Sequence, residues 1–163
     1  MNPYETEKLV QEYLLFHYGK PEDILPWDFG PSGALNFPQR VVQETFDLEK
    51  VPEDARALDV GCAVGQSSFV LSEHCAEVIG IDYSSAFIMA ADTMKREGVM
   101  PCTRLEEAGR TTELELRRYD RAHPERVRFE TGDAMDLRGG LGHFDLVLAA
   151  NLMCRLREAS LFL

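Results

Sequence analysis

The sequence predicts an α/β fold with a Rossmann-like parallel sheet, helices on both faces and an N-terminal helical cap. An apolar run at 57–60 ends in a glycine turn, and a segment compatible with a helix follows at 66–71. A second near-continuous apolar run, at 77–82, ends in an acidic residue, as expected for a strand buried on both faces. Strand patterns at 125–131 and 143–150 extend this alternation of strands and helices, which is typical of α/β domains.

The glycine turn after the first strand is the predicted ligand site. Gly61 and Gly65 suit a tight turn in which backbone N–H groups approach a ligand closely. A dinucleotide fingerprint would have a glycine where this chain has Ala63, and Asp59 stands two residues before the turn. A carboxylate there disfavours a pyrophosphate and favours an ammonium or sulfonium ligand. The pattern D-x-G-C-x-x-G therefore resembles the first motif of class I S-adenosylmethionine (SAM) methyltransferases; a glycine turn without a ligand is the alternative.

Acidic residues also follow the second and third strands. Asp82 lies about 20 residues after Gly61, the offset at which an acid reaches ribose hydroxyls in doubly wound folds. Asp133 can accept a hydrogen bond from an adenine amino group, while a neighbouring backbone N–H meets a ring nitrogen. An exposed strand-end aspartate is the alternative for Asp82. The predicted cofactor-binding residues are Asp59, Gly61, Cys62, Ala63, Gly65, Asp82, Tyr83, Asp133, Ala134 and Asn151.

Residues 1–50 are predicted to form a helical cap with a substrate loop, in front of a SAM-binding core at 51–163. Asn2 is the expected N-cap of a first helix, with Glu5 three residues later and Gly19 at its end. Aromatic residues cluster in the last turns of this helix. It is expected either to pack on the domain or to cover the cofactor as a lid, and both interpretations can hold.

The loop at 21–38 is rich in Pro and Gly and carries Trp27 and Phe29, so it is expected to fold over a pocket. Asn36 is the predicted cap of a second helix, 37–48. Arg40, in its first turn, suits a carboxylate of the cofactor or of an amino-acid substrate. A solvated surface arginine is the alternative. The predicted substrate-side residues are Tyr4, Tyr13, His17, Trp27, Phe29, Asn36 and Arg40.

The remaining segments predict the rest of the core. A helix is expected from Ser84 or Ser85 to about Glu97. The stretch 98–124 is an insertion, with a helix possible at 112–121, or a flexible excursion. A last helix is expected at 152–163. We expect a truncated core in which the final strands of a full methyltransferase sheet are missing.

Composition restricts the partners. The 163 residues include 17 Lys and Arg against 28 Asp and Glu, a net charge of −11, which disfavours nucleic acid and anionic membranes. The four cysteines form no C-x-x-C pair and indicate reduced thiols without a metal site. Neither a signal peptide nor a spanning apolar segment is recognisable. We therefore expect a cytoplasmic protein that acts on a small molecule.

The first 40 residues resemble one family more narrowly. The segments NPYET at 2–6, EYLLFHYG at 12–19, LPW at 25–27, FGP at 29–31 and ALNFPQR at 34–40 look like the start of the 4-mercaptohistidine N1-methyltransferase family. That family makes ovothiol, as a separate enzyme or as the C-terminal domain of a sulfoxide synthase. The resemblance covers nearly the whole chain, and a histidine cluster of the synthase half is not recognisable.

The resemblance implies SAM-dependent methylation of an imidazole nitrogen of 4-mercaptohistidine (5-thiohistidine), with a sulfoxide synthase domain of a longer protein as partner. A neutral ring nitrogen is already nucleophilic, so catalysis requires mainly alignment and exclusion of water. No catalytic base is assigned. The alternatives are another small-molecule SAM methyltransferase and a non-catalytic SAM-binding or regulatory module.

Overall fold

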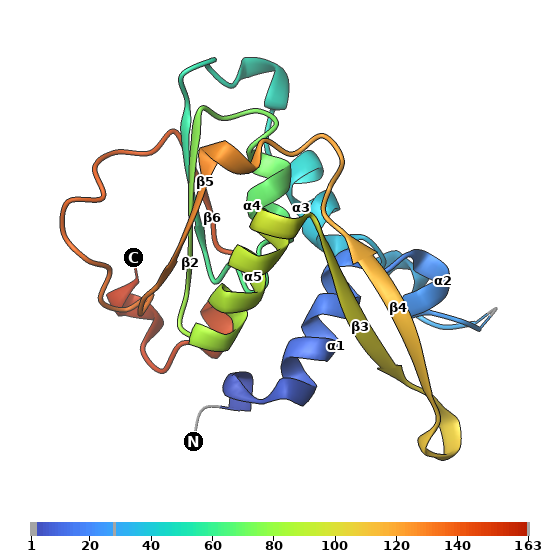
Figure 1. The fold of residues 1–163 in the computed structure, drawn as a ribbon. Coiled ribbons are helices and arrows are strands. Elements are labelled where there is room, and N and C mark those ends of the chain that lie inside the picture. Colours follow the sequence, from blue (N-terminus) through green and yellow to red (C-terminus); the bar gives the residue numbers. More distant parts are fainter. Residues whose placement is uncertain (1–2, 28, 163) are drawn as a thin grey trace.

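The computed structural model describes residues 3–27 and 29–162, and these contain a central sheet of four parallel strands. The strands are β1 Arg56–Val60, β2 Glu77–Asp82, β5 Val127–Thr131 and β6 Leu146–Leu148. Their order, β5-β2-β1-β6, is that of one half of a doubly wound sheet together with the first strand of the other half (Figure 1). The α/β prediction is confirmed, although the fourth strand is shorter than the expected 143–150.

Two hydrophobic clusters lie on opposite faces of the sheet. The helices α4 Gln66–Leu71 and α5 Ser85–Glu97 cover one face (Figure 1). Ser84 is the N-cap of α5, and its side chain accepts from the Phe87 N–H. On the other face, apolar strand residues pack against segments between 134 and 162; they are Leu58, Val60, Ile79 and Ile81. Within the described residues these covering segments form loops and 3₁₀ turns, so α-helices cover one face and not both.

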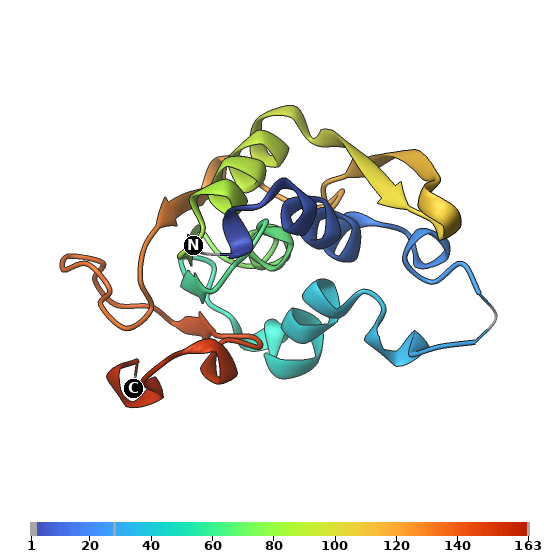
Figure 2. The same cartoon turned by 90° about the horizontal axis from the view of Figure 1, so that it is seen from below.

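The N-terminal segment packs beside α5 (Figure 2). A 3₁₀ turn at Pro3–Glu5 leads into α1 Glu7–Tyr18, whose N-cap is Thr6. The predicted cap Asn2 lies outside the described residues, and the α-helix begins later than expected because the Thr6 hydroxyl accepts from the Leu9 N–H. At the other end, the Tyr18 hydroxyl donates to the Val64 carbonyl at 2.5 Å, which attaches α1 to the glycine turn.

Two further helices precede the sheet. They are α2 Pro21–Ile24 and α3 Phe37–Thr45, and α3 packs against α4. The predicted second helix, 37–48, thus ends three residues early, with a separate 3₁₀ turn at Leu48–Lys50. Asn36 occupies the cap position in a left-handed conformation, but its side chain makes no capping hydrogen bond.

The stretch 98–124 contains a β-hairpin rather than the helix considered for 112–121. Its antiparallel strands, β3 Val99–Leu105 and β4 Thr111–Arg117, pack against α1 (Figure 1). The sequence of β4, TTELELR, alternates polar and apolar residues, which places Leu114 and Leu116 on one face. This period of two residues is the signal that the helical interpretation missed.

The helix expected at 152–163 is also wrong for the described residues up to 162. Two 3₁₀ turns, Met153–Arg155 and Ala159–Leu161, stand there instead. Asn151 adopts a left-handed φ of 54°, and Leu156 is extended, so neither end can continue a helix. Among the described residues, none of the helices combines the length and the apolar character that a membrane-spanning helix requires.

Candidate functional site

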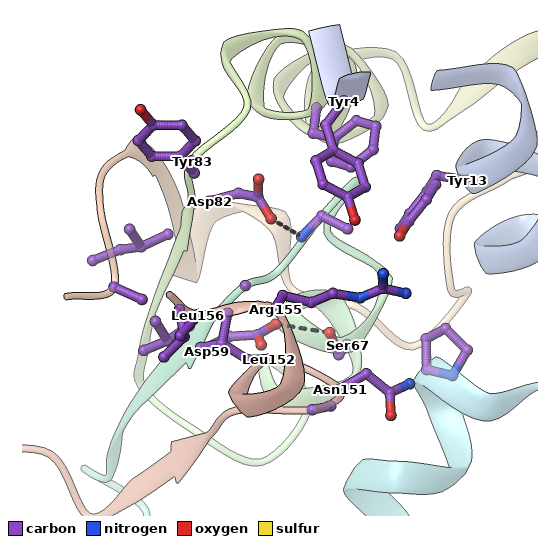
Figure 3. A pocket seen from close by; sticks show the side chains of 18 of the residues that line it. Tyr4, Tyr13, Asp59, Ser67, Asp82, Tyr83, Asn151, Leu152, Arg155 and Leu156 are labelled. Atoms are coloured by element: carbon purple, nitrogen blue, oxygen red, sulfur yellow. Dashed lines mark hydrogen bonds between the residues drawn. The ribbon is translucent and has the colours of Figure 1, made fainter. Parts of the chain in front are cut away.

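A cavity of about 820 Å³ opens at the carboxyl ends of the parallel strands. This volume lies within the range of about 300–1,000 Å³ that is typical of small-molecule sites. Residues after β1, β2, β5 and β6 form one side, and residues of α1 and α3 form the other (Figure 3). The carboxyl edge of an open α/β sheet is where ligands bind in such folds.

Asp59 forms the floor of the cavity and is almost completely buried, with 1% of its surface exposed. Its Oδ2 accepts hydrogen bonds from the hydroxyls of Ser67 and Ser68, both at 2.7 Å, and Figure 3 shows the bond from Ser67. Burial raises the pKa of Asp59 to about 6, and the two serine hydroxyls oppose that rise. Ser67 also lines the cavity. Sequence reasoning missed it, although it lies in the first turn of the helix that follows the glycine turn.

Asp82 joins the end of β2 to the glycine turn. Its Oδ2 accepts from the Ala63 N–H at 2.9 Å and its Oδ1 from the Ser84 N–H at 2.8 Å. Burial raises the pKa of Asp82, and these backbone hydrogen bonds oppose the rise. Each carboxylate oxygen retains acceptor capacity after one hydrogen bond, and Asp82 lines the cavity. The side chain is thus fixed and can still accept from a ligand.

The two glycines of the turn have different tasks. Gly61, at φ 78°, lines the cavity beside Leu152. Gly65, at φ 91°, is the N-cap of α4 and does not line the cavity. A Cβ on Gly65 would lie 2.5 Å from the Phe129 ring. The glycine is therefore required by packing against Phe129, and not by the approach of a ligand. Cys62 is likewise buried in the core and does not line the cavity.

The remaining predicted cofactor residues all border the cavity. Asp133 and Ala134 follow β5, and the Asp133 Oδ1 accepts from the Met135 N–H at 2.9 Å. Tyr83 follows Asp82, with 65% of its surface exposed. Asn151 follows β6 in the left-handed conformation. The structure therefore brings Asp59, Asp82 and Asp133 to a single cavity.

Aromatic rings form the opposite wall. Tyr13 lies 4.6 Å from the Phe87 ring and 6.0 Å from each of the Tyr4 and His17 rings, measured between centroids. His17 is half-buried, and its Nδ1 has no hydrogen-bond partner among the described residues. Burial lowers the pKa of His17 far below its ordinary value, so the imidazole is neutral near physiological pH.

Four predicted substrate residues lie outside the cavity lining. Trp27 and Phe29 stack on each other and are exposed, at 54% and 77% of their surfaces. Asn36 stands at the N-cap position of α3. Arg40 pairs with Glu44 one turn along the same helix, with Nε 2.7 Å from the carboxylate, and its Nη1 donates to the Gly33 carbonyl. Of the described residues in the loop expected to cover the cavity, 21–38, only Phe37 and Pro38, at the start of α3, line it.

Arg155 is another cavity residue that sequence reasoning overlooked, as is its neighbour Arg157. It ends the 3₁₀ turn Met153–Arg155, and its side chain extends between the labelled acids and Tyr13 (Figure 3). The segment from 152 was expected to be a helix, and none of its side chains was assigned to the site.

Comparison with protein families matches residues 58–163 to a methyltransferase domain. A search of curated proteins finds no match. Among solved structures, the chain is similar to magnesium protoporphyrin IX methyltransferase (ChlM) from Synechocystis PCC 6803, with 18% identity over 98% of the chain and a TM-score of 0.59. That protein was solved with bound SAM and with bound SAH, and the chain covers 64% and 61% of those two structures.

A second similar structure is EvdMO1, with 18% identity, 99% of this chain covered, 33% of that chain covered and a TM-score of 0.53. At these identities the likeness concerns the fold. The chain spans less than two thirds of the length of each of these structures.

Proposed function

Because the chain belongs to the methyltransferase domain family, we propose that it binds SAM in the carboxyl-edge cavity and transfers the methyl group to a small-molecule acceptor. The convergence of Asp59, Asp82 and Asp133 on one cavity is the observation that supports this function most strongly. A site for a phosphate ligand would be expected to contain basic side chains or free N–H groups where these carboxylates stand.

The residues present fit SAM. The two fixed oxygens of Asp82 can accept from the two ribose hydroxyls. Asp133 and Ala134 border the part of the cavity expected for adenine, and Gly61 leaves room beside the turn. Asp59 and Ser67 form the floor for the positively charged methionine end. An ionised Asp59 next to a cation would regain part of the free energy lost through its burial.

Bound SAM supplies a methyl group on a sulfonium that is its own leaving group. The protein then has to align the acceptor and exclude water, and alignment alone can provide effective molarities of about 10⁵ M or more. Tyr4, Tyr13 and Phe87 form an apolar wall that suits a flat ring. His17 is neutral and has an unpartnered Nδ1 among the described residues, so it can orient a polar ring without adding charge.

The acceptor that we propose is 4-mercaptohistidine, methylated on a ring nitrogen in ovothiol biosynthesis. The segments at 2–6, 12–19 and 34–40 that resemble the 4-mercaptohistidine N1-methyltransferase family support this acceptor, as does the aromatic wall around Tyr13. A sulfoxide synthase, in the same longer protein or as a separate chain, would supply the thioimidazole. The site would then act in the cytoplasm on a small molecule.

The test combines binding and product analysis. The chain is titrated with SAM by calorimetry, then incubated with SAM and 4-mercaptohistidine, and the position of the new methyl group is determined by mass spectrometry and NMR. We expect binding and a ring N-methyl product. Binding with methylation of other amines, thiols or carboxylates, but not of the thioimidazole, would overturn the acceptor. Absence of SAM binding would overturn the function as a whole.

A further inference from the structure

We propose that Arg155 and Tyr13 form a carboxylate-binding subsite on the acceptor side of the cavity. The subsite rests on the proposed function, since it would bind the carboxylate of an amino-acid acceptor. It gives this task to a residue of the segment after β6, whereas the sequence had suggested Arg40.

The backbone after β6 directs Arg155 into the cavity. Asn151 turns the chain through its left-handed φ of 54°, and the Arg155 N–H donates to the Leu152 carbonyl at 2.8 Å. This tight turn sits over the carboxyl end of β1, where Leu152 packs against β1 and β2 side chains. The Arg155 side chain leaves the turn toward α1, on the far side of the cavity (Figure 3).

The guanidinium of Arg155 faces phenol groups. In Figure 3 the hydroxyls of Tyr4 and Tyr13 point toward it from the 3₁₀ turn Pro3–Glu5 and from α1. Burial and the neighbouring Tyr4 raise the pKa of Tyr13, and the Arg155 cation opposes that rise, as expected for two groups within electrostatic reach. Tyr13 is therefore a neutral phenol, whose O–H can donate to an anion beside the guanidinium.

Arg155 has no carboxylate partner within ion-pair distance in the described part of the chain. Other arginines do have one: Arg56 pairs with Glu77 at 2.5 Å and Arg138 with Glu130 at 2.7 Å. In a chain of net charge −11, acidic side chains are plentiful, yet the described acids near the cavity do not pair with this arginine. A cation that lines a cavity without an internal partner favours an anionic ligand, and the guanidinium fork matches a carboxylate.

The position within the cavity distinguishes two carboxylates. The methionine end of SAM is expected beside Asp59 and Ser67, under the glycine turn. The Arg155 guanidinium lies toward Tyr13 and the α1 wall, where the acceptor is expected (Figure 3). The subsite would therefore select acceptors that carry a carboxylate over their decarboxylated counterparts.

The experiment uses the whole chain and two matched acceptors, 4-mercaptohistidine and its decarboxylated counterpart 4-mercaptohistamine. Arg155→Gln is compared with wild type, with Arg155→Lys and with Arg110→Gln, which removes the same charge from the exposed tip of the hairpin. We expect Arg155→Gln to raise the KM for 4-mercaptohistidine by about 10–100-fold, in line with the loss of a charge-assisted hydrogen bond. Its KM for 4-mercaptohistamine and its affinity for SAH should stay within about twofold of wild type.

The KM of Arg155→Lys for 4-mercaptohistidine should lie between those of wild type and Arg155→Gln, because lysine keeps the positive charge but lacks the guanidinium fork. Calorimetric titration with histidine and with histamine, in the presence of SAH, gives the same comparison without turnover. An equal loss for both acceptors, or a loss of SAH affinity of the same size, would overturn the subsite. If wild type binds SAH, and Arg155→Gln binds histidine as tightly as wild type does, only the proposed subsite is wrong. If wild type binds no SAH, the proposed function fails first.

Discussion

Ionisation of Asp59 has opposite effects on the stability of the unliganded chain and on the binding of a cationic ligand. Its carboxyl is 1% exposed and its pKa is raised from 3.8 to about 6, chiefly by burial. The folded chain therefore binds this proton more tightly than the unfolded chain does. The contribution of Asp59 to stability is most favourable below about pH 4 and becomes unfavourable as the pH rises through about 6. A cationic ligand would compensate this cost only when the carboxylate is ionised.

Asp59→Asn should thus stabilise the unliganded chain at high pH. We expect the free energy of unfolding of the variant to exceed that of wild type by on the order of 1–3 kcal/mol at about pH 8, and by much less at about pH 4. Urea denaturation at several pH values measures this difference. Parallel pH profiles for the two proteins would mean that Asp59 does not carry the raised pKa.

Asp82 offers a separate test of the ribose site. Asp82→Asn keeps one acceptor oxygen for the turn but loses the charge, so SAH affinity should fall by about 10–100-fold. Calorimetry measures the affinity, and circular dichroism checks the fold. Asp54→Asn is the matched control, since Asp54 is an exposed aspartate in the loop before β1. Equal SAH affinity in the two variants would remove Asp82 from the site.

At the scale of residues, the sequence predicted which acids meet but not the basic group opposite them. Asp59, Asp82 and Asp133 follow strands, and parallel strands bring their carboxyl ends to one edge whatever the loops do. Arg40 and Arg155 lie in segments whose direction depends on packing. Arg40 pairs with Glu44 on its own helix. Their i, i+4 spacing could have predicted this ion pair from the sequence, in place of a ligand contact.

At the scale of elements, strands and helices with strong patterns were predicted closely, and the hairpin was not. The pattern of α5 fixes its buried face, with Phe87, Ala91 and Met94 inside. The hairpin β3–β4 has one face on α1 and the other in solvent, so its apolar signal is diluted by charged residues. Its mixed charge concealed the alternation that Leu114 and Leu116 show.

The hairpin buries one side chain from each strand, Cys102 from β3 and Leu116 from β4. Leu116 is 2% exposed, whereas Leu105, on the partner strand, is 69% exposed. We expect Leu116→Ala to lower the free energy of unfolding by about 2–4 kcal/mol, from lost burial and the cavity that remains. Leu105→Ala should change it by less than about 0.5 kcal/mol. Thermal or urea denaturation compares them, and similar losses would contradict the observed packing of the hairpin.

At the scale of the molecule, the cavity is built from segments that are distant in sequence. The Ser84 hydroxyl donates to the Tyr4 carbonyl across 80 residues, and the Glu5 carboxylate accepts from the Ser85 and Ala86 N–H groups at the start of α5. Tyr18 contacts the glycine turn, and Leu152 reaches back to β1. The sequence predicted a helical cap but not these contacts, because they depend on side chains that meet only after the sheet has formed.

This architecture predicts which segments of the chain ligand binding should stabilise. A ligand that fills the cavity contacts α1, the glycine turn and the turn at Met153–Arg155 together, so SAH should slow amide exchange in all three. At a free SAH concentration of about 100 times Kd, the free energy of unfolding should rise by about 2.7 kcal/mol. Hydrogen exchange and thermal denaturation measure the two effects.

The hairpin tip around Gly109 provides the internal control, because it lies outside the cavity lining and should exchange at the same rate with and without SAH. Asp82→Asn, at the same SAH concentration, should show a smaller thermal shift in proportion to its weaker binding. Protection from amide exchange that is confined to the glycine turn and β2 would show that α1 and the turn at Met153–Arg155 do not enclose the ligand. SAH would then rest on the sheet edge alone, and α1 and the backbone turn at Met153–Arg155 would not close over it.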